Sequence, residues 1–412
     1  MSLSGVSRKL VPVVLAVAAC SDPSSPGGAQ IDALPRPLSV SEQKLISGSN
    51  TFAFDLLRTI NTAQRNENVF VSPLSASMAL GMAASGASGG TYTAMHDALR
   101  LGTATKKEVN EGYKSLISLL RGLDASTDFR IANSIWYEST FPFNASFLAD
   151  GKSYFDATVS PLDFKNAASV DAVNAWVNDN TGRKIPKILD VIQPDEVMLL
   201  INAIYFKGIW QKQFKKSETT NAPFFAYDGT SAQVPMMHQS TTLRRAFGSS
   251  YQAVDLLYGN SAFAMTILLP NPGVDINTFA ENLTPEVWGT IETSFHEGEA
   301  DLYLPRFKLA WERKLNPDLK AMGMGLAFSE AATFEGMSSQ NPNLMLTNVI
   351  QKTFVDVNEE GTEAAAATSV GVGPTSAPAS LRVDRPFVVM IRERFSGSIL
   401  FVGKIVKLPA AS

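Results

Sequence analysis

The chain has 412 residues, of which 45% are hydrophobic and 18% are charged. This composition is typical of a soluble globular protein, and the length fits one large domain or two average ones. The 35 basic and 39 acidic residues give a formal net charge of -4, so there is no reason to expect nucleic acid as a partner, which would need a basic face.

The N-terminus has the pattern of an export signal. Arg8 and Lys9 precede a short apolar run from Leu10 to Ala19. A run of about ten residues is too short for a bilayer core that needs about twenty, but it fits the hydrophobic region of a secretory signal peptide. We therefore predict a signal peptide at residues 1–19 and export of the protein.

Cys20 is the only cysteine in the chain and directly follows the apolar run. This arrangement resembles the lipobox of bacterial lipoproteins, which implies cleavage before Cys20, lipid on this residue and a flexible tether at residues 20–38. The protein would then be anchored to a membrane of the bacterial cell envelope. The alternative is a plain secretory signal with a chance cysteine. Either way, no disulfide can form within the chain.

From residue 39 onward no linker or repeat interrupts the chain, so we predict a single domain at residues 39–412. Residues 68–71 have the pattern of a short buried strand. A helix is expected to follow, with Ser72 as its N-cap, Pro73 at its first position and its end at Gly86.

Several apolar runs further along the chain have the length of strands. Residues 131–137, 197–206 and 263–269 predict strands that are covered on both faces, as in a large central sheet under helices. Further strands are expected at 301–311, 386–391 and 398–406. Because helices and strands do not alternate strictly, the predicted fold class is α+β.

Two short motifs are those of hydrolases, but neither has the required context. Gly86 to Gly90 match G-x-S-x-G around Ser88, yet the preceding segment predicts a helix, which favours a glycine-rich helix end over a strained strand-to-helix turn. Ser41 to Lys44 match S-x-x-K without its companion motifs. We therefore do not expect an enzyme.

The sequence also lacks the motifs that bind metals or cofactors. The three histidines, His96, His238 and His296, have no partner at metal-ligand spacing. The sequence contains neither a phosphate loop nor a dinucleotide fingerprint. We expect no metal and no cofactor.

The segment from Asn358 to Ser380 combines features of a loop and of a buried strand. Successive strand residues point to opposite faces. One alternating set carries no charge: Thr362, Ala364, Ala366, Thr368, Val370, Val372 and Pro374. The segment is therefore interpreted as an exposed loop that can become a central strand of a sheet.

The residues 358–368, NEEGTEAAAAT, resemble the reactive-loop hinge of the serpins. Further blocks in the order of that family are NVFVSPLSASMALGMA at 68–83, NAIYFKGIW at 202–210, YLPRFKL at 303–309, and DRPFVVMIRE and GSILFVGKI near the end. The resemblance covers about residues 45 to 409.

This resemblance implies a serpin fold with a large central sheet, two smaller sheets, eight or nine helices and an exposed reactive loop at about 359–380. It also implies a suicide-substrate inhibitor of serine proteases. The protease cleaves the loop and forms an acyl-enzyme, and the cut loop then inserts into the central sheet and distorts the protease. The alternative within the family is a non-inhibitory serpin acting as a binding or chaperone-like protein.

The reactive bond and the hinge follow from the same resemblance. Counting forward from Gly361 and back from Pro386 places the reactive bond at Thr375–Ser376, with Val372 as a second choice. Small residues there imply an elastase- or subtilisin-type target. The hinge residues are Glu359, Glu360, Gly361, Thr362, Glu363, Ala364, Ala365, Ala366, Ala367 and Thr368.

Other positions match regions that the family uses for loop insertion. Ser72, Ser75 and Asn202 match the shutter beneath the central sheet, and Trp210 matches the breach, where the loop first enters; simple core filling is the alternative role. Gln351 is a departure, because many serpins have histidine there. Glutamine can donate and accept, so it could still bond Asn202 or Ser72, but it does not titrate. We therefore hypothesise that strand opening lacks a histidine-linked pH response. We expect a monomer.

Overall fold

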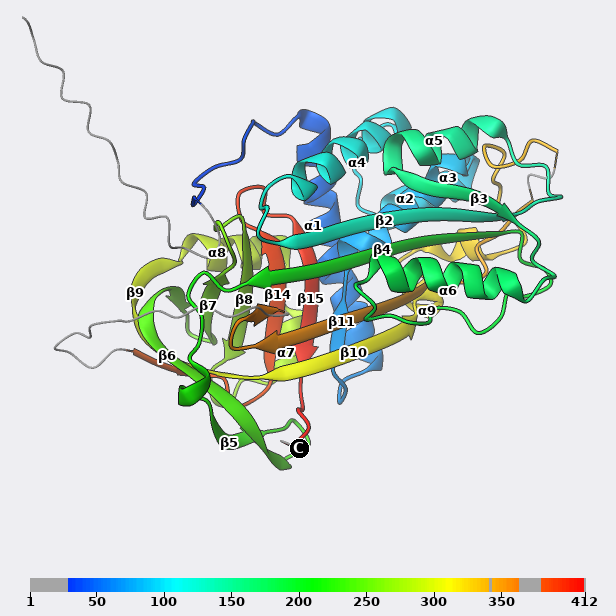
Figure 1. The fold of residues 1–412 in the computed structure, drawn as a ribbon. Helices are drawn as coiled ribbons and strands as arrows, with labels where there is room; N and C mark the ends of the chain where they lie inside the picture. Colours follow the sequence, from blue (N-terminus) through cyan, green and yellow to red (C-terminus); the bar gives the residue numbers. More distant parts are fainter. Residues whose placement is uncertain (1–28, 341–342, 363–378, 411–412) are drawn as a thin grey trace, which may run out of the picture.

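The computed structural model describes residues 29–340, 343–362 and 379–410. Within these ranges nine α-helices and two short 3-10 helices surround two sheets (Figure 1). The helices are α1 (Val40–Ala63), α2 (Pro73–Gly86), α3 (Gly89–Ala98), α4 (Lys106–Arg121), α5 (Ala145–Phe155), α6 (Ala168–Asn180), α7 (Ile276–Glu281), α8 (Pro285–Thr293) and α9 (Asn316–Ala321), with η1 (Lys216–Glu218) and η2 (Met324–Phe328).

The strands are β1 (Val69–Val71), β2 (Asp128–Glu138), β3 (Ala157–Leu162), β4 (Met198–Ile209), β5 (Thr220–Phe225), β6 (Ser231–Phe247), β7 (Tyr251–Leu257), β8 (Phe263–Pro270), β9 (His296–Pro305), β10 (Phe307–Lys314), β11 (Ile350–Asn358), β12 (Gly361–Thr362), β13 (Ala379–Arg382), β14 (Phe387–Glu393) and β15 (Ile399–Ile405). The predicted α+β class is confirmed.

The strands form two sheets rather than the three that were expected. One sheet has six strands in the order β10-β11-β12-β4-β2-β3, and the other has nine strands, running from β1 to β13, with β5 attached to β6. The 17-residue strand β6 explains the difference. It pairs with β9 along most of its length and with β7 at its end, so the two smaller sheets are joined into one.

The predicted helix after Ser72 is present with the expected bounds. The Ser72 hydroxyl accepts a hydrogen bond from the backbone N–H of Ser75 at 3.3 Å, and Pro73 occupies the first turn, where no donor is lost. α2 is apolar on all sides because it contacts β4 of one sheet and β15 of the other. It forms the centre of the core between the two sheets.

The predicted strand at 301–311 is divided in two. β9 ends at Pro305 and β10 begins at Phe307, because the two strands belong to different sheets: β9 pairs with β6 and β10 with β11. Arg306, between them, donates its backbone N–H to the carbonyl of Pro235 at 2.8 Å. Alternation along the sequence gives no signal for such a change of sheet.

The described part of the predicted tether lies against the domain. Ile31 donates its backbone N–H to the carbonyl of Asn260 at 2.9 Å, and Ile31, Leu34 and Leu38 pack against the core. Arg36 donates two hydrogen bonds, at 2.7 and 2.9 Å, to the buried carboxylate of Glu42. Burial alone would raise the pKa of Glu42, but the bonds from Arg36, from the backbone of Ser39 and from Ser115 lower it to about 2.

The predicted signal peptide at residues 1–19 and the start of the predicted tether, with Cys20, lie outside the described residues. In the part of the chain that the structure describes, no helix is both long enough and apolar enough to cross a bilayer.

Candidate functional site: the entrance between β4 and β11

The start of the predicted hinge already forms a strand of the six-stranded sheet. Gly361 and Thr362, as β12, pair with Ile209 and Gly208 of β4 on one side and with the end of β11 on the other. Within the described residues, no register joins β4 directly to β11, so β12 is their link. In Figure 1, β4 and β11 lie in one layer, and α6 packs on β2 and β4 of that layer.

The exposed loop was expected from residue 359, but Glu359 to Thr362 are buried. Their burial follows from the pairing of β12 with strands on both sides. The rest of the predicted hinge, Glu363 to Thr368, and the predicted reactive bond at Thr375–Ser376 lie outside the described residues.

Gly361 can be no other residue without a shift of the backbone. Its φ angle is +154°, and a Cβ atom on it would stand 2.1 Å from the carbonyl oxygen of Gly208. The glycine lets the hinge turn out of β11 and approach β4 closely.

Trp210, the predicted breach residue, directly contacts the hinge. Its indole Nε1–H donates to the carbonyl of Asn358 at 2.9 Å, and its backbone N–H donates to the carbonyl of Glu360 at the same distance. The ring is 1% exposed and stacks on Tyr258 with a centroid distance of 4.4 Å. The Tyr258 hydroxyl and Thr362 Oγ1 are 2.7 Å apart, and burial raises the pKa of Tyr258, so the phenol stays neutral.

Two acidic residues of the hinge, Glu359 and Glu360, are buried beside cations. Glu359 accepts a hydrogen bond from Thr219 Oγ1 at 2.8 Å and lies 3.5 Å from a guanidinium nitrogen of Arg306. Glu360 pairs with Lys216, and the hydrogen bond to this carboxylate raises the pKa of the lysine. These contacts hold the hinge at the end of the sheet.

The predicted shutter residues meet at the N-terminus of α2. Gln351 accepts the backbone N–H of Ser72 at 3.0 Å and donates to the Ser72 carbonyl at 2.7 Å. Ser72 Oγ donates to the carbonyl of Leu400 at 2.7 Å, and Ser75 Oγ donates to the carbonyl of Asn202 at 3.4 Å. Buried hydrogen bonds therefore join α2 to both sheets.

Asn202 is linked to β2 rather than to Gln351. Its Nδ2 donates to Asn133 Oδ1, whereas its own Oδ1 is buried and has no hydrogen-bond partner within the described residues. Trp210 lies eight residues further along the chain from Asn202, about 26 Å in an extended strand. The structure thus brings Ser72, Ser75 and Gln351 together, with Asn202 next to them, and places Trp210 at the other end.

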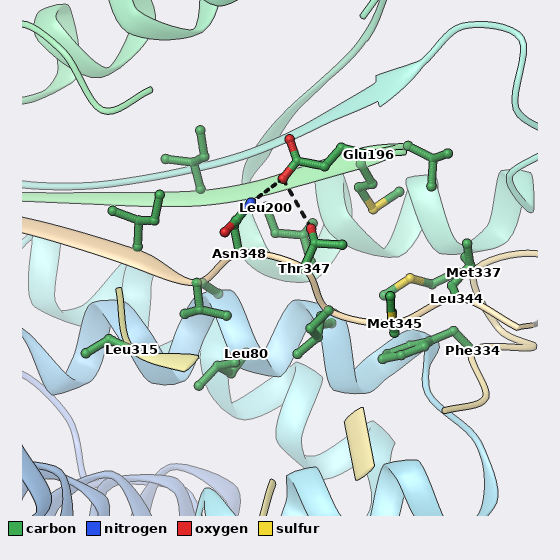
Figure 2. A pocket seen from close by; sticks show the side chains of 18 of the residues that line it. Leu80, Glu196, Leu200, Leu315, Phe334, Met337, Leu344, Met345, Thr347 and Asn348 are labelled. Atoms are coloured by element: carbon green, nitrogen blue, oxygen red, sulfur yellow. Dashed lines mark hydrogen bonds between the residues drawn. The ribbon is translucent and has the colours of Figure 1, made fainter. Parts of the chain in front are cut away.

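Below Asn202 and Gln351, a cavity of about 260 Å³ lies between β4, α2 and the chain that leads into β11. Figure 2 shows Leu80, Leu315 and Phe334 on one side of it and the carboxylate of Glu196 on the other. Sequence reasoning missed this cavity because its walls come from separate segments. It also missed Tyr258, Lys216 and Arg306, which no local pattern connects with the hinge.

The hydrolase motifs have no catalytic setting. Ser88 is the N-cap of α3, two residues after the end of α2, so it stands between two helices and not at a strand-to-helix turn. Ser41 to Lys44 lie in the first turns of α1, where Glu42 completes a capping box with Ser39. Across the described ranges, no three His, Cys, Asp or Glu side chains gather as a metal site.

Comparisons with known proteins agree with this arrangement. The family model "Serpin (serine protease inhibitor)" matches residues 47–408. The leukocyte elastase inhibitor of Sus scrofa is 35% identical over 380 residues, which are 87% of this chain and 98% of that protein. Human Serpin B3 is 33% identical over 386 residues, with the same shares of each chain.

Two solved structures have the same fold over nearly the whole chain. Human thyroxine-binding globulin in complex with thyroxine has a TM-score of 0.83 and 29% identity, covering 90% of this chain and 100% of that one. The thermophilic serpin Tengpin in its native state has a TM-score of 0.81 and 27% identity, covering 92% and 97%. From the family match, the extent of these identities and the hinge in its sheet, the chain belongs to the serpin family.

Proposed function

We propose that this chain is a suicide-substrate inhibitor of serine proteases of elastase or subtilisin type. The observation that carries the proposal is the position of β12, which already separates β4 from β11 at one end of the sheet. The protease supplies the catalytic serine and this chain supplies the bait, so the chain has no enzymatic activity of its own.

Loop insertion would continue the register that β12 begins. Thr362 stands opposite Gly208, so each further pair of loop residues would advance two residues down β4 towards Asn202. Thr362, Ala364, Ala366 and Thr368 would point to one face, and none of them carries a charge. Burying a charged side chain there would cost several kcal/mol and slow insertion relative to hydrolysis of the acyl-enzyme.

The target class rests on the residues at the proposed reactive bond. Thr375 and Ser376 are small and uncharged, so they suit proteases with a small specificity pocket, and Val372 is a second cleavage position. The relatives named leukocyte elastase inhibitor support this direction. Arg382, the nearest arginine, is placed after the proposed bond and lies in β13.

The test is to mix the protein with elastase-, subtilisin-, chymotrypsin- and trypsin-type proteases and to analyse denaturing gels and the released peptide by mass. We expect a denaturation-resistant complex with an elastase- or subtilisin-type enzyme and a peptide that begins at Ser376. Cleavage of the loop without any complex would contradict inhibition and leave only a substrate.

A second candidate function is that of a non-inhibitory serpin that acts as a binding or chaperone-like protein. The structural likeness to thyroxine-binding globulin, which is seen with thyroxine, favours it. The hinge argues against it, because residues 362–368 contain neither proline nor more than one charge. If no protease of the panel forms a complex, the non-inhibitory function would be favoured over inhibition.

We further propose that the chain is a monomeric bacterial lipoprotein of the cell envelope, held to the membrane through lipid on Cys20. Its support is the apolar run that ends at the only cysteine. In a bacterial host, the protein should partition into the detergent phase, and Cys20→Ser should move it to the aqueous phase. Equal partitioning of the two forms would favour a secreted protein.

A further inference from the structure

Glu196 is a buried carboxylate that none of the proposed inhibitory steps uses. It is 5% exposed. One carboxylate oxygen accepts hydrogen bonds from Asn348 Nδ2 at 2.5 Å and Thr347 Oγ1 at 3.2 Å, and the other accepts the backbone N–H of Gln193 at 2.8 Å (Figure 2). All three donors are neutral. In the part of the chain that the structure describes, no Lys, Arg or His forms an ion pair with Glu196.

A buried carboxylate is normally paired with a cation, because its loss of hydration is otherwise poorly compensated. Of the residues that line the cavity beside it, two, Asp195 and Glu196, are acidic and none is basic. Asn202 also lines this cavity, and its Oδ1 is buried without a hydrogen-bond partner within the described residues. A ligand that donates hydrogen bonds and carries a positive charge would therefore match the polar groups of the cavity.

The wall of the cavity opposite Glu196 is apolar. Leu80 and Leu315 lie across from Glu196, with Phe334 and Met337 further along (Figure 2). Met345 also lines the cavity and is 44% exposed, so the cavity reaches the surface at this residue. An apolar cavity with a few convergent polar groups is the usual form of a small-molecule site.

We propose that this cavity binds a small organic cation, a primary amine with an apolar body. The ammonium group would donate to the carboxylate of Glu196, and the apolar body would lie against Leu80, Leu315 and Phe334. A hydrogen bond between an ammonium and a carboxylate is stronger than one between neutral groups. A carboxylic acid of the same shape is excluded by repulsion from Glu196.

The site has a regulatory consequence that rests on the proposed function. The cavity lies between the start of β4 and the chain leading into β11, which is the space that an inserted strand would occupy below Asn202 and Gln351. A bound amine and a fully inserted strand exclude one another. The amine therefore converts the inhibitor into a substrate, since insertion is slowed while the acyl-enzyme still hydrolyses.

Calorimetric titration of the full chain with 2-phenylethylamine, 2-phenylethanol and 3-phenylpropionate tests the site without any protease. We expect the amine to bind at least about tenfold more tightly than the alcohol, and the acid not to bind. Equal binding of amine and alcohol, or no binding of the amine, would overturn the proposal.

Glu196→Gln provides the matched variant, because it removes the charge and keeps the size of the side chain. It should reduce the preference for the amine over the alcohol to less than about twofold. Asp190→Asn, at an exposed carboxylate that does not line the cavity, is the control and should leave the preference unchanged. If Glu196→Gln does not fold, Ala79→Leu serves instead: it narrows the cavity from the α2 side and should weaken both probes. Undiminished amine binding by either variant would place the amine elsewhere.

The protease experiment separates the two proposals. If the amine binds and increases the share of cleaved chain relative to protease complex, both the cation site and the inhibitory function are supported. If it binds but no protease forms a complex even without it, the cation site stands and inhibition fails. If complexes form and the amine has no effect on them at saturation, the regulatory consequence is wrong.

Discussion

We call the space between β4 and β11 the slot; its entrance is at β12, and its far end is at the cavity beside Glu196. The two ends differ in how their polar groups are paired. At the entrance, Trp210, Tyr258 and Lys216 each contact the hinge, and the acidic side chains there lie beside cations. At the far end, the carboxylate of Glu196 has only neutral donors, and Asn202 Oδ1 has no partner within the described residues. The polar groups at the entrance therefore have partners within the chain, whereas those at the far end would obtain further partners from the proposed bound cation.

Under the proposed function, this difference would give loop insertion a direction. β12 is already paired with β4 and β11 at the entrance, so an inserting loop would extend this pairing one residue at a time. The following substitutions test the contrast between the two ends.

The largest effect is expected from Thr362→Arg at the entrance. Thr362 is 2% exposed and bonded to Tyr258, so a charged side chain cannot be buried there without a cost of several kcal/mol. The variant should be cleaved by an elastase-type protease and form almost no stable complex on denaturing gels. Ser380→Arg, at an exposed position of β13, is the control and should keep the complex. Normal trapping by Thr362→Arg would refute an insertion that starts at β12.

Trp210→Ala should lower the free energy of unfolding by about 3–5 kcal/mol, because a fully buried aromatic ring is lost. Trp210→Phe keeps a ring on Tyr258 and loses the hydrogen bond to the Asn358 carbonyl. Its cost should include about 1 kcal/mol for that bond, in addition to the smaller ring. Denaturant unfolding measures both values. Equal stability of the two variants would show that the stacking of an aromatic ring on Tyr258 does not stabilise the entrance.

Gln351→His tests the middle of the slot. Gln351 both accepts from and donates to the Ser72 backbone, and a protonated histidine cannot accept. The variant should lose about 1 kcal/mol of stability at neutral pH. It should lose more as the pH falls through the ordinary histidine pKa near about 6.5, whereas the parent protein should show no such change. An insertion rate of the variant that is the same at mildly acidic and neutral pH would reject a role of this position in pH response.

Lys216→Ala should have the smallest effect, because the lysine is mostly exposed although it pairs with Glu360. The pair raises the lysine pKa in the folded state, so its contribution is present below the unfolded pKa and is lost as the pH rises through the folded value. Melting temperatures measured above and below about pH 10.5 should differ less in the variant than in the parent. Lys215→Ala, which removes a pair with Glu218, should not change this difference.

Much of the fold could be predicted because the signals are local. The helix from Pro73 to Gly86 follows from its cap, its proline and its glycine, and the apolar runs mark β2, β4 and β8. The length of β6 could not be used in the same way. Its pairing with two different strands joins two sheets, and such pairing depends on tertiary contacts that one segment does not encode.

The candidate site was predictable to a different degree at its two ends. The hinge and Trp210 lie in blocks that resemble a known family, so they could be named from the sequence. Glu196 belongs to no motif. Its interest lies in the lack of an ion-pair partner among the described residues, which only the folded chain reveals. Gln351 lay between these cases: its hydrogen-bonding capacity was predictable, but its partner, the Ser72 backbone, was one of two that were considered.

The hydrogen bond from Ile31 to Asn260 limits the length of the tether between a lipid on Cys20 and the domain. Only ten residues, 21–30, separate the two positions, and a fully extended chain of this length spans at most about 40 Å. An inhibitor on such a tether would keep Ile31 within about 40 Å of the bilayer surface. Proteases that approach the cell surface would meet it, and those free in the surrounding fluid would rarely do so.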